Sequence, residues 1–511
     1  MPAPADRTLD APPVTVVDAS VSGWATVSDD PTATSPEAAV PPDASEGVDA
    51  PGLTDIVGGV LVQTGTTRMH GGGVDSRRLQ PGQTFFALPG ERVDGHDFLA
   101  EAVAAGAAGL VVGRSLAPHE LADLRSTSIV RVDDVAAALR TLAAAHRDRF
   151  DPLVVGITGS IAKTSTKEQT AELLSERFEV LRNVGNENNE IGLPLTLLRL
   201  TAEHEIAVLE MGLYTTGEIA LLAGIARPTV GVVTAVRGVH LSRAGTIEAI
   251  EHGKRELVEA LPASGTAILN ADDPRVAGMA GHTRATVMTY GFDTHADVHA
   301  RDVVSEGEAG MRFDLHLPAA TVAVRTPVLG RHGVHNALAA VAVALTAGMS
   351  HDAIVAGLKR EVRAPHRSQL VRAGEWTILD DTYNASPDAV MAALDLLGEL
   401  PGRRVAVLGE MLELGDDAAD AHLRVGRHVP GTAEKLVVVG AGASGIAEGA
   451  MEAGLPEDDV ERVSGRDAAL ELLLAELRPG DRVLIKASRG EALDLLVDRL
   501  RLAAAAGSAE A

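Results

Sequence analysis

The sequence contains no cysteine and has few aromatic residues. Without a thiol, the chain cannot form a disulfide, a thiolate metal site or a cysteine nucleophile. Phe, Trp and Tyr make up only 2% of the 511 residues, so a core has to be built from Ala, Val, Leu and Ile. The overall hydrophobic content of 46% is still ample for folding, and the length predicts about three domains.

Positive charge is scarce as well. Lys and Arg number 45 against 71 Asp and Glu, for a net charge of −26. Nucleic acid and anionic membranes bind basic patches, so neither is expected as the main partner, although a local cluster of donors can still bind a phosphorylated small molecule.

No apolar run approaches the ~18 residues of a membrane span. The N-terminal stretch lacks the basic and apolar regions of a signal peptide. We therefore expect a cytoplasmic protein with no membrane span.

Composition and pattern divide the chain into four parts. Residues 1–51 hold nine of the 25 prolines and no lysine, which predicts a disordered tail whose deletion leaves activity intact. Short strands around an Ala-rich helix predict a small α/β domain over 52–150. Strands that alternate with helices predict a doubly wound parallel sheet over 151–328, which ends in a half-exposed hairpin. The same alternation predicts a Rossmann-like domain over 329–511, so the fold class is three-domain α/β.

The stretch GITGSIAKTSTKE, residues 156–168, has the features of a phosphate-binding loop. A buried strand ends in a Gly- and Ser-containing turn, and a helix is expected to begin at Lys163. The N–H groups at the helix start would face phosphates, Lys163 would reach the β- and γ-phosphates, and the Thr164 hydroxyl would ligate Mg²⁺. The strict pattern has glycine where Ile157 and Ala162 stand, so this stretch alone leaves an ordinary strand–helix turn open.

Ala162 is the unusual residue of this loop, because glycine is usual directly before the lysine. Alanine still donates its N–H group. If the position needs a positive φ, the Cβ atom costs about 1–2 kcal/mol. If φ is negative, the only change is one methyl group near the phosphates. Either cost is tolerable, whereas loss of Lys163 would be far more serious.

Two further polar residues follow predicted strands of the same sheet. Glu210 ends the strand in IAVLE, and His240 follows the strand in VGVVTAV. Open α/β sheets build their sites at the carboxyl ends of strands, and a carboxylate there can ligate the Mg²⁺ of a nucleotide. A helix-capping role for Glu210 and a structural role for His240 remain the alternatives.

Two patterns elsewhere have simpler structural explanations. The G-x-G-x-x-G at residues 440–445 follows a strand, as in dinucleotide-binding proteins. No clear acidic residue ends a second strand about 20 residues on, so we expect turn and helix-packing glycines. His332 and His335 are three residues apart in a segment that reads as a helix start, and no third metal ligand is evident.

Several longer stretches resemble the Mur ligases. GNENNEIGLPLTLLRL, AVLEMGLYTTGEIALLAGIARPTVGVVTAV, HL and GTIEAIEHGKREL resemble the ATPase domain of this family. DSRRLQPGQTFFALPGERVDGHDF is similar to its uridine-binding domain. LDDTYNASPDAVMAAL and VLGEMLELG resemble the branch that adds D-alanyl-D-alanine, and we find no Asp-Asn-Pro-Arg motif of the branch that adds the third amino acid. The likeness covers nearly everything after residue 52.

The resemblance implies an ATP- and Mg²⁺-dependent ligase that acts as a monomer in peptidoglycan precursor synthesis. It would join D-Ala-D-Ala to UDP-MurNAc-tripeptide through an acyl phosphate. The implied catalytic residues are Lys163, Glu210, His240, Lys254 and Arg367. The implied magnesium ligands are Thr164, Glu210, His240 and a carbamylated Lys254. The implied ATP-binding residues are Gly159, Ser160, Ile161, Ala162, Lys163, Thr164, Ser165, Asn336 near the adenine, Arg367 near the phosphates and Asp381 near the ribose. The implied substrate-binding residues are Ser76 and Arg77 near the UDP, and Asn188 and Asn189 near the muramyl peptide.

The chain also departs from the family pattern. Besides Ala162, it has Gly333 in place of Asn, Ala487 in place of Gly, and Ser242 where Glu is frequent. None of these changes removes a residue with an implied catalytic role. A Mur-type ligase for a different amino acid or peptide, or a non-catalytic nucleotide-binding homologue, remains an alternative. The complete set of matched site residues argues against the second.

Overall fold

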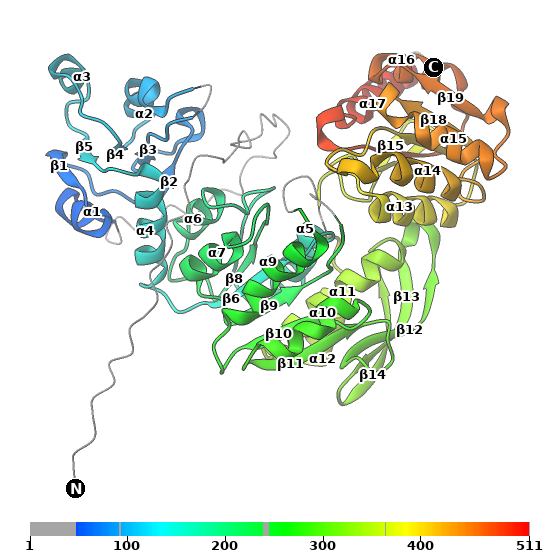
Figure 1. Ribbon diagram of the computed structural model, residues 1–511, viewed down its shortest axis with the longest axis horizontal. Helices are drawn as coiled ribbons and strands as arrows, with labels where there is room; N and C mark the ends of the chain where they lie inside the picture. The colour runs from blue at the N-terminus through cyan, green and yellow to red at the C-terminus, as the bar shows by residue number, and fades with distance from the viewer. Residues whose placement is uncertain (1–46, 91–92, 239–244, 363, 510–511) are drawn as a thin grey trace, which may run out of the picture.

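The computed structural model describes residues 47–90, 93–238, 245–362 and 364–509, which form three α/β units in chain order (Figure 1). Each unit is built on its own sheet, and the three sheets contain five, nine and six strands. In Figure 1 the N-terminal unit, in blue and cyan, and the C-terminal unit, in yellow to red, flank the central unit. The predicted three-domain α/β fold is confirmed.

The N-terminal unit has a five-stranded sheet in the order β1-β5-β4-β3-β2. All neighbouring pairs are parallel except β1 with β5. Successive side chains of a strand point to opposite faces of the sheet. Phe86 and Val111 therefore lie in the core that contains α1 and α4, while Phe85 and Leu110 lie in the core on the other face, with α2. The elements are α1 (Ala50–Val57), β1 (Val60–Gln63), β2 (Gly72–Gly73), β3 (Thr84–Phe86), α2 (Leu99–Ala104), β4 (Gly109–Val112), α3 (Pro118–Asp123), β5 (Ser128–Arg131) and α4 (Val135–Arg147).

The last residues of the expected tail belong to this unit. Val48 exchanges two backbone hydrogen bonds of 2.8 Å with Met69. The Asp49 side chain accepts from the Gly52 N–H at 2.9 Å and so caps α1. Because a side-chain cap and a bridge hold this segment, we propose that the domain reaches back from the expected residue 52 to Gly47. Residues 1–46 of the expected tail lie outside the described residues.

The central unit has a nine-stranded sheet in the order β14-β13-β12-β11-β10-β9-β6-β8-β7. The strands from β7 to β12 are parallel, and β12, β13 and β14 are antiparallel. Phe313 and Leu315 of β13 face the core and alternate with more exposed residues, which confirms the expected hairpin. The strands are β6 (Leu153–Thr158), β7 (Val180–Arg182), β8 (Ile206–Glu210), β9 (Val230–Val233), β10 (Thr266–Asn270), β11 (Thr286–Gly291), β12 (Val298–Ser305), β13 (Met311–Leu317) and β14 (Ala320–Thr326).

Helices cover both faces of this sheet, and two of them come from beyond the expected domain boundary. Val334, Leu338 and Ile354, from α11 and α12, share one core with Val155 and Val208 of the sheet. A boundary at residue 328 would divide this core, so we propose that the central unit continues to about residue 360. The helices are α5 (Lys163–Leu174), α6 (Gly192–Leu197), α7 (Glu218–Ala226), α9 (Ile247–Glu259), α10 (Pro274–Gly278), α11 (Gly330–Thr346) and α12 (His351–Gly357).

The C-terminal unit has a six-stranded sheet in the order β15-β16-β20-β17-β18-β19, parallel except for β15. Gly440, at φ 83°, forms the turn after β18, and a Cβ on Gly445 would lie 3.1 Å from the His422 Cβ of α14. These glycines therefore serve turn and packing roles. The elements are β15 (Gln369–Ala373), β16 (Trp376–Asp380), α13 (Pro387–Glu399), β17 (Arg404–Leu408), α14 (Ala418–His428), β18 (Lys435–Val439), α15 (Ser444–Glu452), β19 (Val460–Val463), α16 (Arg466–Glu476), β20 (Arg482–Lys486) and α17 (Asp494–Ala509).

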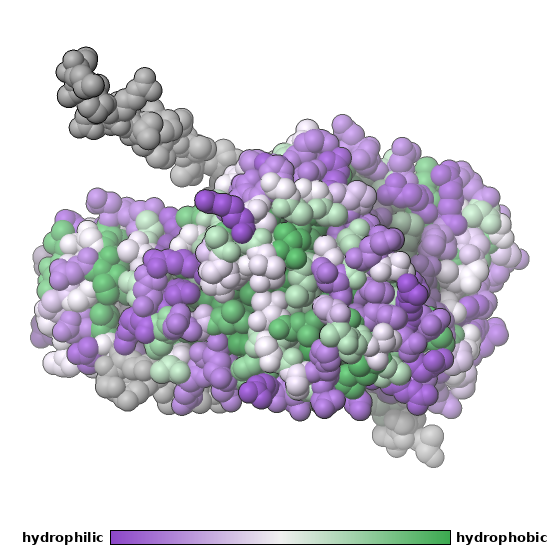
Figure 2. Space-filling view, turned by 90° about the horizontal axis from the view of Figure 1, so that it is seen from below, coloured by the Kyte–Doolittle hydropathy of each residue, from purple (hydrophilic) through white to green (hydrophobic). Residues whose placement is uncertain are grey.

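The face in Figure 2 mixes hydrophilic and hydrophobic residues, and its hydrophobic residues lie in small groups. Val60, Leu61 and Val62 are exposed together on β1, whereas the other exposed apolar residues, such as Leu221 and Leu502, are scattered along the chain. Such isolated residues are normal on a protein surface. In the part of the chain that the structure describes, no helix combines the length and the hydropathy that a membrane span requires.

The N-terminal boundary can be tested with two truncations. A chain that starts at Gly47 is predicted to keep the stability and activity of the full chain. A chain that starts at Gly52 loses the Val48–Met69 bridge and the Asp49 cap, and loss of such a cap alone costs about 1 kcal/mol. Denaturant unfolding of both truncations beside the full chain measures the difference. Equal stability of the two truncations would contradict the boundary at Gly47.

Candidate functional site

The phosphate loop connects β6 to α5 in the central unit. Ala162 immediately precedes the helix and has a φ of 67°, in the left-handed region. Its carbonyl accepts from the Thr166 N–H at 2.8 Å, so the helix begins directly after it. The first of the two expected conformations is therefore the correct one, and the Cβ atom costs about 1–2 kcal/mol. N–H groups at a helix start have no acceptor within the helix, which makes this end suitable for phosphate.

The loop is held by the segment that follows β9. The Ser160 N–H donates to the Ala235 carbonyl at 2.8 Å. The Thr234 hydroxyl donates to the Ile161 carbonyl at 2.6 Å. A Cβ atom on Gly159 would lie 1.8 Å from the Thr234 Oγ1, so only glycine fits there. The loop conformation is thus held by contacts from a neighbouring strand end.

Lys163, the first residue of α5, folds back over the loop. Its Nζ donates to the Gly159 carbonyl at 2.8 Å. Burial lowers the pKa of Lys163 from its ordinary value, and the nearby Glu210 only partly offsets this effect. The charge of Arg367 also lowers the pKa of Lys163. The two basic side chains are therefore near enough for their charges to interact.

Glu210 lies at the carboxyl end of β8, as predicted, and is only 2% exposed. Its Oε1 accepts from the Asn188 Nδ2 at 2.7 Å. Its Oε2 is buried and has no hydrogen-bond partner within bonding distance among the described residues, although the Thr164 hydroxyl lies near enough to the carboxyl to lower its pKa. Burial raises the pKa of Glu210, but Lys167 and Lys163 outweigh this effect, so the pKa lies below its usual value. A buried, ionised carboxylate oxygen without a donor fits a ligand of a hard divalent cation.

Lys254 lies on α9 and is 3% exposed. Burial, together with the charge of Lys163, holds its pKa well below the ordinary 10.5. In the part of the chain that the structure describes, the amine makes no hydrogen bond and no ion pair. A neutral lysine amine is the form that adds carbon dioxide to become a carbamate. The environment of Lys254 therefore fits the carbamylation that the family resemblance implies.

Three other predicted nucleotide contacts gather on the same side of the central unit. Asn336 of α11 is 5% exposed. The Arg367 guanidinium lies 3.9 Å from the ring centre of Tyr383 and lowers the pKa of Glu210. Asp381 is already paired, because its Oδ2 lies 2.6 Å from the Lys486 Nζ. A carboxylate has several acceptor positions, so Asp381 can still accept from a ribose hydroxyl.

The predicted substrate residues are less tightly grouped. Ser76 and Arg77 lie in the N-terminal unit, where the Arg77 Nη2 pairs with the Asp75 Oδ2 at 2.9 Å. Asn188 joins the site directly through Glu210. Asn189 instead accepts from the Gly192 N–H at 2.8 Å, at the start of α6. His240 lies outside the described residues, so its predicted role as a ligand stays a prediction.

Two residues of the site were missed by sequence reasoning. Lys167 is fully buried, and its Nζ contacts the Asn183 carbonyl at 2.6 Å and the Glu168 Oε1 at 2.7 Å. Residues four apart share a helix face, so its spacing from Lys163 could have revealed it. Asn270 ends β10 at the same sheet edge as Glu210, and its Oδ1 lies 3.2 Å from the His335 Nε2. The strand-end argument used for Glu210 applies equally to Asn270.

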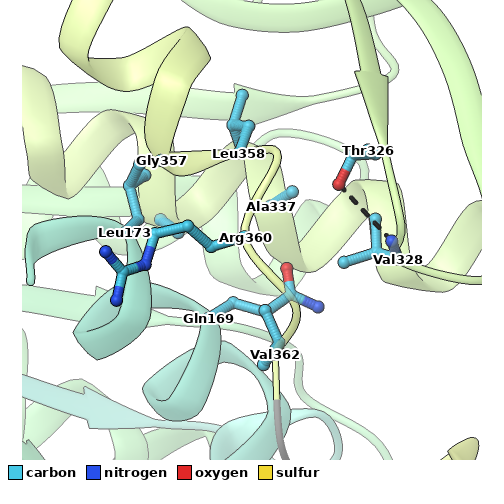
Figure 3. Close-up of a pocket in the computed structure, with 10 residues that line it drawn as sticks. Gln169, Leu173, Thr326, Val328, Ala337, Gly357, Leu358, Arg360 and Val362 are labelled. Carbon is cyan, nitrogen blue, oxygen red and sulfur yellow. Dashed lines mark hydrogen bonds between the residues drawn. The ribbon is translucent and has the colours of Figure 1, made fainter. Parts of the chain in front are cut away.

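Two cavities lie away from this site. The one in Figure 3 lies between α5, α11 and α12, where Gln169 and Arg360 line it, and holds about 10 Å³. That volume admits about one water molecule. A larger cavity of about 280 Å³ is lined by Arg68, Thr84 and His146, among others. Neither lining includes a residue of the phosphate loop.

Comparisons with known proteins agree with this architecture. Models of the Mur ligase family match all three units. They are described as the Mur ligase family catalytic domain over residues 68–147, the Mur ligase middle domain over 157–344, and the Mur ligase glutamate ligase domain over 366–489.

Individual relatives are similar over most of the chain. The UDP-N-acetylmuramoyl-tripeptide–D-alanyl-D-alanine ligase of Mycobacterium tuberculosis (strain ATCC 25618 / H37Rv) is 42% identical, over 88% of this chain and 96% of the relative. The ligase of the same description from Escherichia coli (strain K12) is 36% identical, over 88% and 97%. A MurF crystal structure from Acinetobacter baumannii superposes with a TM-score of 0.79 at 31% identity, over 89% and 99%. A MurF ligase from Thermotoga maritima in complex with ADP has a TM-score of 0.75 at 27% identity, over 85% and 98%.

The strain at Ala162 leads to a prediction about stability and ATP binding. Ala162→Gly removes about 1–2 kcal/mol of strain but adds about 0.4–1 kcal/mol of unfolded-state entropy. We expect unchanged or up to about 1.6 kcal/mol greater stability, with ATP affinity preserved or improved. Chemical unfolding and calorimetric ATP titration measure both quantities.

Two other variants serve as controls for this prediction. Ala220→Gly, at an exposed right-handed position of α7, is expected to lower stability by up to about 1 kcal/mol. Lys163→Ala is expected to abolish activity. A destabilised Ala162→Gly protein would contradict the strain argument, and wild-type turnover in Lys163→Ala would contradict the assignment of the phosphate loop.

Proposed function

This chain belongs to the Mur ligase family, and on that basis we propose that it joins D-Ala-D-Ala to UDP-MurNAc-tripeptide in an ATP-dependent reaction of peptidoglycan precursor synthesis. The observation that carries the proposal is the meeting of the phosphate loop, Lys163, Glu210 and Lys254 at one sheet edge. The likeness to D-alanyl-D-alanine ligases over 88% of the chain supports the choice of substrates. In keeping with small soluble substrates, we place the reaction in the cytoplasm and expect a monomer.

The reaction brings two anions together, because a substrate carboxylate must attack the γ-phosphate of ATP. An acidic chain with a net charge of −26 needs local positive charge for this step. Lys163 and Arg367 supply it, and the N–H groups at the start of α5 bind the phosphate oxygens. The carboxylate oxygen bonds to the γ-phosphorus, the bond from this phosphorus to the β,γ-bridging oxygen breaks, and ADP leaves, so that the carboxylate becomes an acyl phosphate. The amine of D-Ala-D-Ala attacks its carbonyl carbon, the C–O bond to phosphate breaks, and the amine loses a proton.

Magnesium fits the remaining groups. Thr164, Glu210 and a carbamylated Lys254 would hold it, together with His240, and the donor-free Oε2 of Glu210 supports this placement. When bound, the cation would neutralise phosphate charge and orient the transferred group. Lys167 holds Glu210 in its ionised form by lowering its pKa. The chain thus keeps a carboxylate ready in a buried position where burial alone would favour its protonation.

The substrates would extend from this site toward the other units. Ser76 and Arg77 would bind the UDP group, and Asn188 would lie near the muramyl peptide. Asn336, Arg367 and Asp381 would bind the nucleotide from the side of α11 and the C-terminal unit. An acyl phosphate must be kept from water, so docking of the C-terminal unit over the central unit would protect it.

A phosphate-release assay tests the proposed function. We expect the purified chain to release phosphate from ATP with Mg²⁺ only when UDP-MurNAc-tripeptide and D-Ala-D-Ala are both present, and to form the joined product by mass spectrometry. Release only with a single amino acid would point to another Mur-type ligase. No release with any acceptor, despite ATP binding, would point to a non-catalytic homologue.

Carbamylation of Lys254 gives a separate prediction. Only the neutral amine reacts with carbon dioxide, and the lowered pKa of Lys254 favours that form. With ¹³C-bicarbonate we expect a protein carbamate signal in NMR that is lost as the pH falls through the lowered pKa.

Two variants interpret that signal. Lys254→Met is expected to lose it, and ligation should fall by about 100-fold because a charge-stabilising group is missing. Lys359→Met replaces an exposed lysine after α12 and is expected to keep both the signal and the activity. A signal that survives in Lys254→Met would assign the carbamate elsewhere.

A further inference from the structure

Arg237 is attached to the phosphate loop through its main chain. It follows β9, and its N–H donates to the Ser160 Oγ at 2.9 Å. The Ser160 hydroxyl in turn donates to the Arg237 carbonyl at 3.0 Å. One loop hydroxyl therefore fixes both backbone groups of Arg237. A displacement of the Arg237 main chain would therefore also displace Ser160 of the loop.

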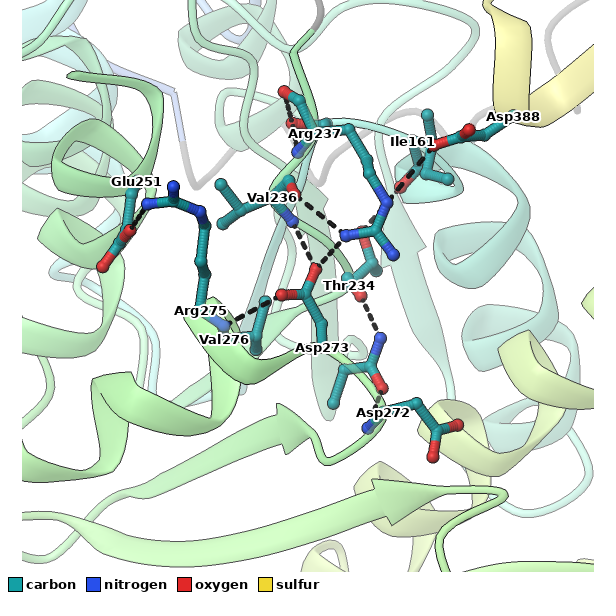
Figure 4. A network of polar contacts seen from close by, with 12 residues as sticks. Ile161, Thr234, Val236, Arg237, Glu251, Asp272, Asp273, Arg275, Val276 and Asp388 are labelled. Atoms are coloured by element: carbon teal, nitrogen blue, oxygen red, sulfur yellow. Dashed lines mark hydrogen bonds and ion pairs between the residues drawn. The ribbon is translucent and has the colours of Figure 1, made fainter. Parts of the chain in front are cut away.

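The side chain of Arg237 spans two units of the protein (Figure 4). Its Nη1 contacts the Asp273 Oδ2 at 2.5 Å, and its Nε contacts the Asp388 Oδ2 at 3.3 Å. Asp273 precedes α10 in the central unit, and its side chain is 2% exposed. Asp388 lies in the first turn of α13 in the C-terminal unit, and its side chain is 44% exposed. The guanidinium thus bridges a buried carboxylate and one on the other side of the interface.

Asp273 holds the guanidinium in place independently of Asp388. Its Oδ2 also accepts from the Val236 N–H at 2.9 Å, and its Oδ1 accepts from the Arg275 N–H at 3.0 Å. The Arg237 Nη1 makes a second contact, to the Val236 carbonyl at 2.9 Å. Because the side chain is already ordered, pairing with Asp388 costs little further entropy. A lysine carries all its donors on one nitrogen, so it cannot place two nitrogens against the two carboxylates as the guanidinium does.

We propose that Arg237 is a positioning residue that couples docking of the C-terminal unit to the geometry of the phosphate loop. The inference rests on the proposed ligase function, in which both units contribute to one site. Arg237 contacts the phosphate loop through Ser160, and in the described part of the chain it has no contact with Lys163, Glu210 or Lys254. It acts on them through Ser160 on one side and through Asp388 on the other.

A second set of ion pairs joins the same two units without touching the loop. Glu308, in the turn between β12 and β13, contacts the Arg482 Nη2 at 2.7 Å and the Arg372 Nη2 at 2.5 Å. These pairs would keep the C-terminal unit attached when Asp388 is changed. Loss of the Arg237–Asp388 pair should therefore disturb the docked arrangement at the loop and leave the units joined.

Kinetics of the full chain test this role. Asp388→Asn is expected to lower kcat for ligation by about 3- to 10-fold, while the Kd for ATP alone stays unchanged. Arg237→Lys is expected to keep the contact with Asp273 and show a similar loss of kcat. The double variant should be no slower than the slower single variant, because both changes remove the same contact. Wild-type kcat in Asp388→Asn, or multiplicative losses in the double variant, would overturn the proposal.

A matched control lies on the same helix. Asp395 of α13 pairs with the His428 Nε2 at 2.6 Å, within the C-terminal unit. Asp395→Asn makes the same chemical change in α13 without touching the interface between units, and it is expected to keep wild-type kcat. An equal loss of kcat in Asp395→Asn would show that the effect comes from the helix itself and would overturn the proposed coupling.

A measurement without catalysis separates this inference from the proposed function. The chain has no cysteine, so Arg284→Cys and Glu448→Cys create a specific pair of dye sites, on the central and the C-terminal unit. With ATP bound, energy transfer in Asp388→Asn is expected to shift from the wild-type value. An identical value would refute the coupling. Failure of the wild-type chain to ligate D-Ala-D-Ala would refute the proposed function and leave this measurement valid.

Discussion

The start of α5 is the feature on which the rest of the site depends. Its N–H groups can bind phosphate only if the loop turns sharply at Ala162, and that turn requires a left-handed conformation. The loop holds this conformation because Gly159 packs against Thr234 and Ser160 bonds to the segment after β9. Several contacts with the end of a neighbouring strand thus offset the strain energy of the left-handed conformation at Ala162.

Charge is the second constraint, and it is solved locally. The chain is strongly acidic, yet Lys163, Lys167 and Arg367 surround Glu210 in a buried region. This arrangement keeps the carboxylate ionised, while burial and Lys163 favour a neutral Lys254. One cationic cluster therefore prepares two different groups, a carboxylate and a free amine, for the same cation site. The overall composition gives no indication of this cluster, in which Lys163 and Lys167 of α5 combine with Arg367 from the segment before β15.

Basic residues also lie at the interface between the central and C-terminal units. The charge of Arg367, in the segment between these units, lowers the pKa of Lys163, and Arg237 of the central unit pairs with Asp388 of α13. A ligase that makes a reactive acyl phosphate benefits from a site that is complete only when its units are docked. Arg237 would couple docking to the loop, because its side chain pairs with Asp388 of α13 and its main chain bonds to Ser160 of the loop.

The sequence by itself determined the elements and much of the site. Alternation predicted the sheets and the hairpin, the strand-end rule placed Glu210, and the motif placed Lys163 at a helix start, because these rules depend on near neighbours in the chain. Lys254 came only from family resemblance, since a helix lysine has no local mark of burial. The tertiary structure decided the φ of Ala162, the packing of α11 on the central sheet, and the pairing of Arg237 with Asp388. Each of these depends on which surfaces pack together, and local spacing rules do not encode contacts between residues 150 positions apart.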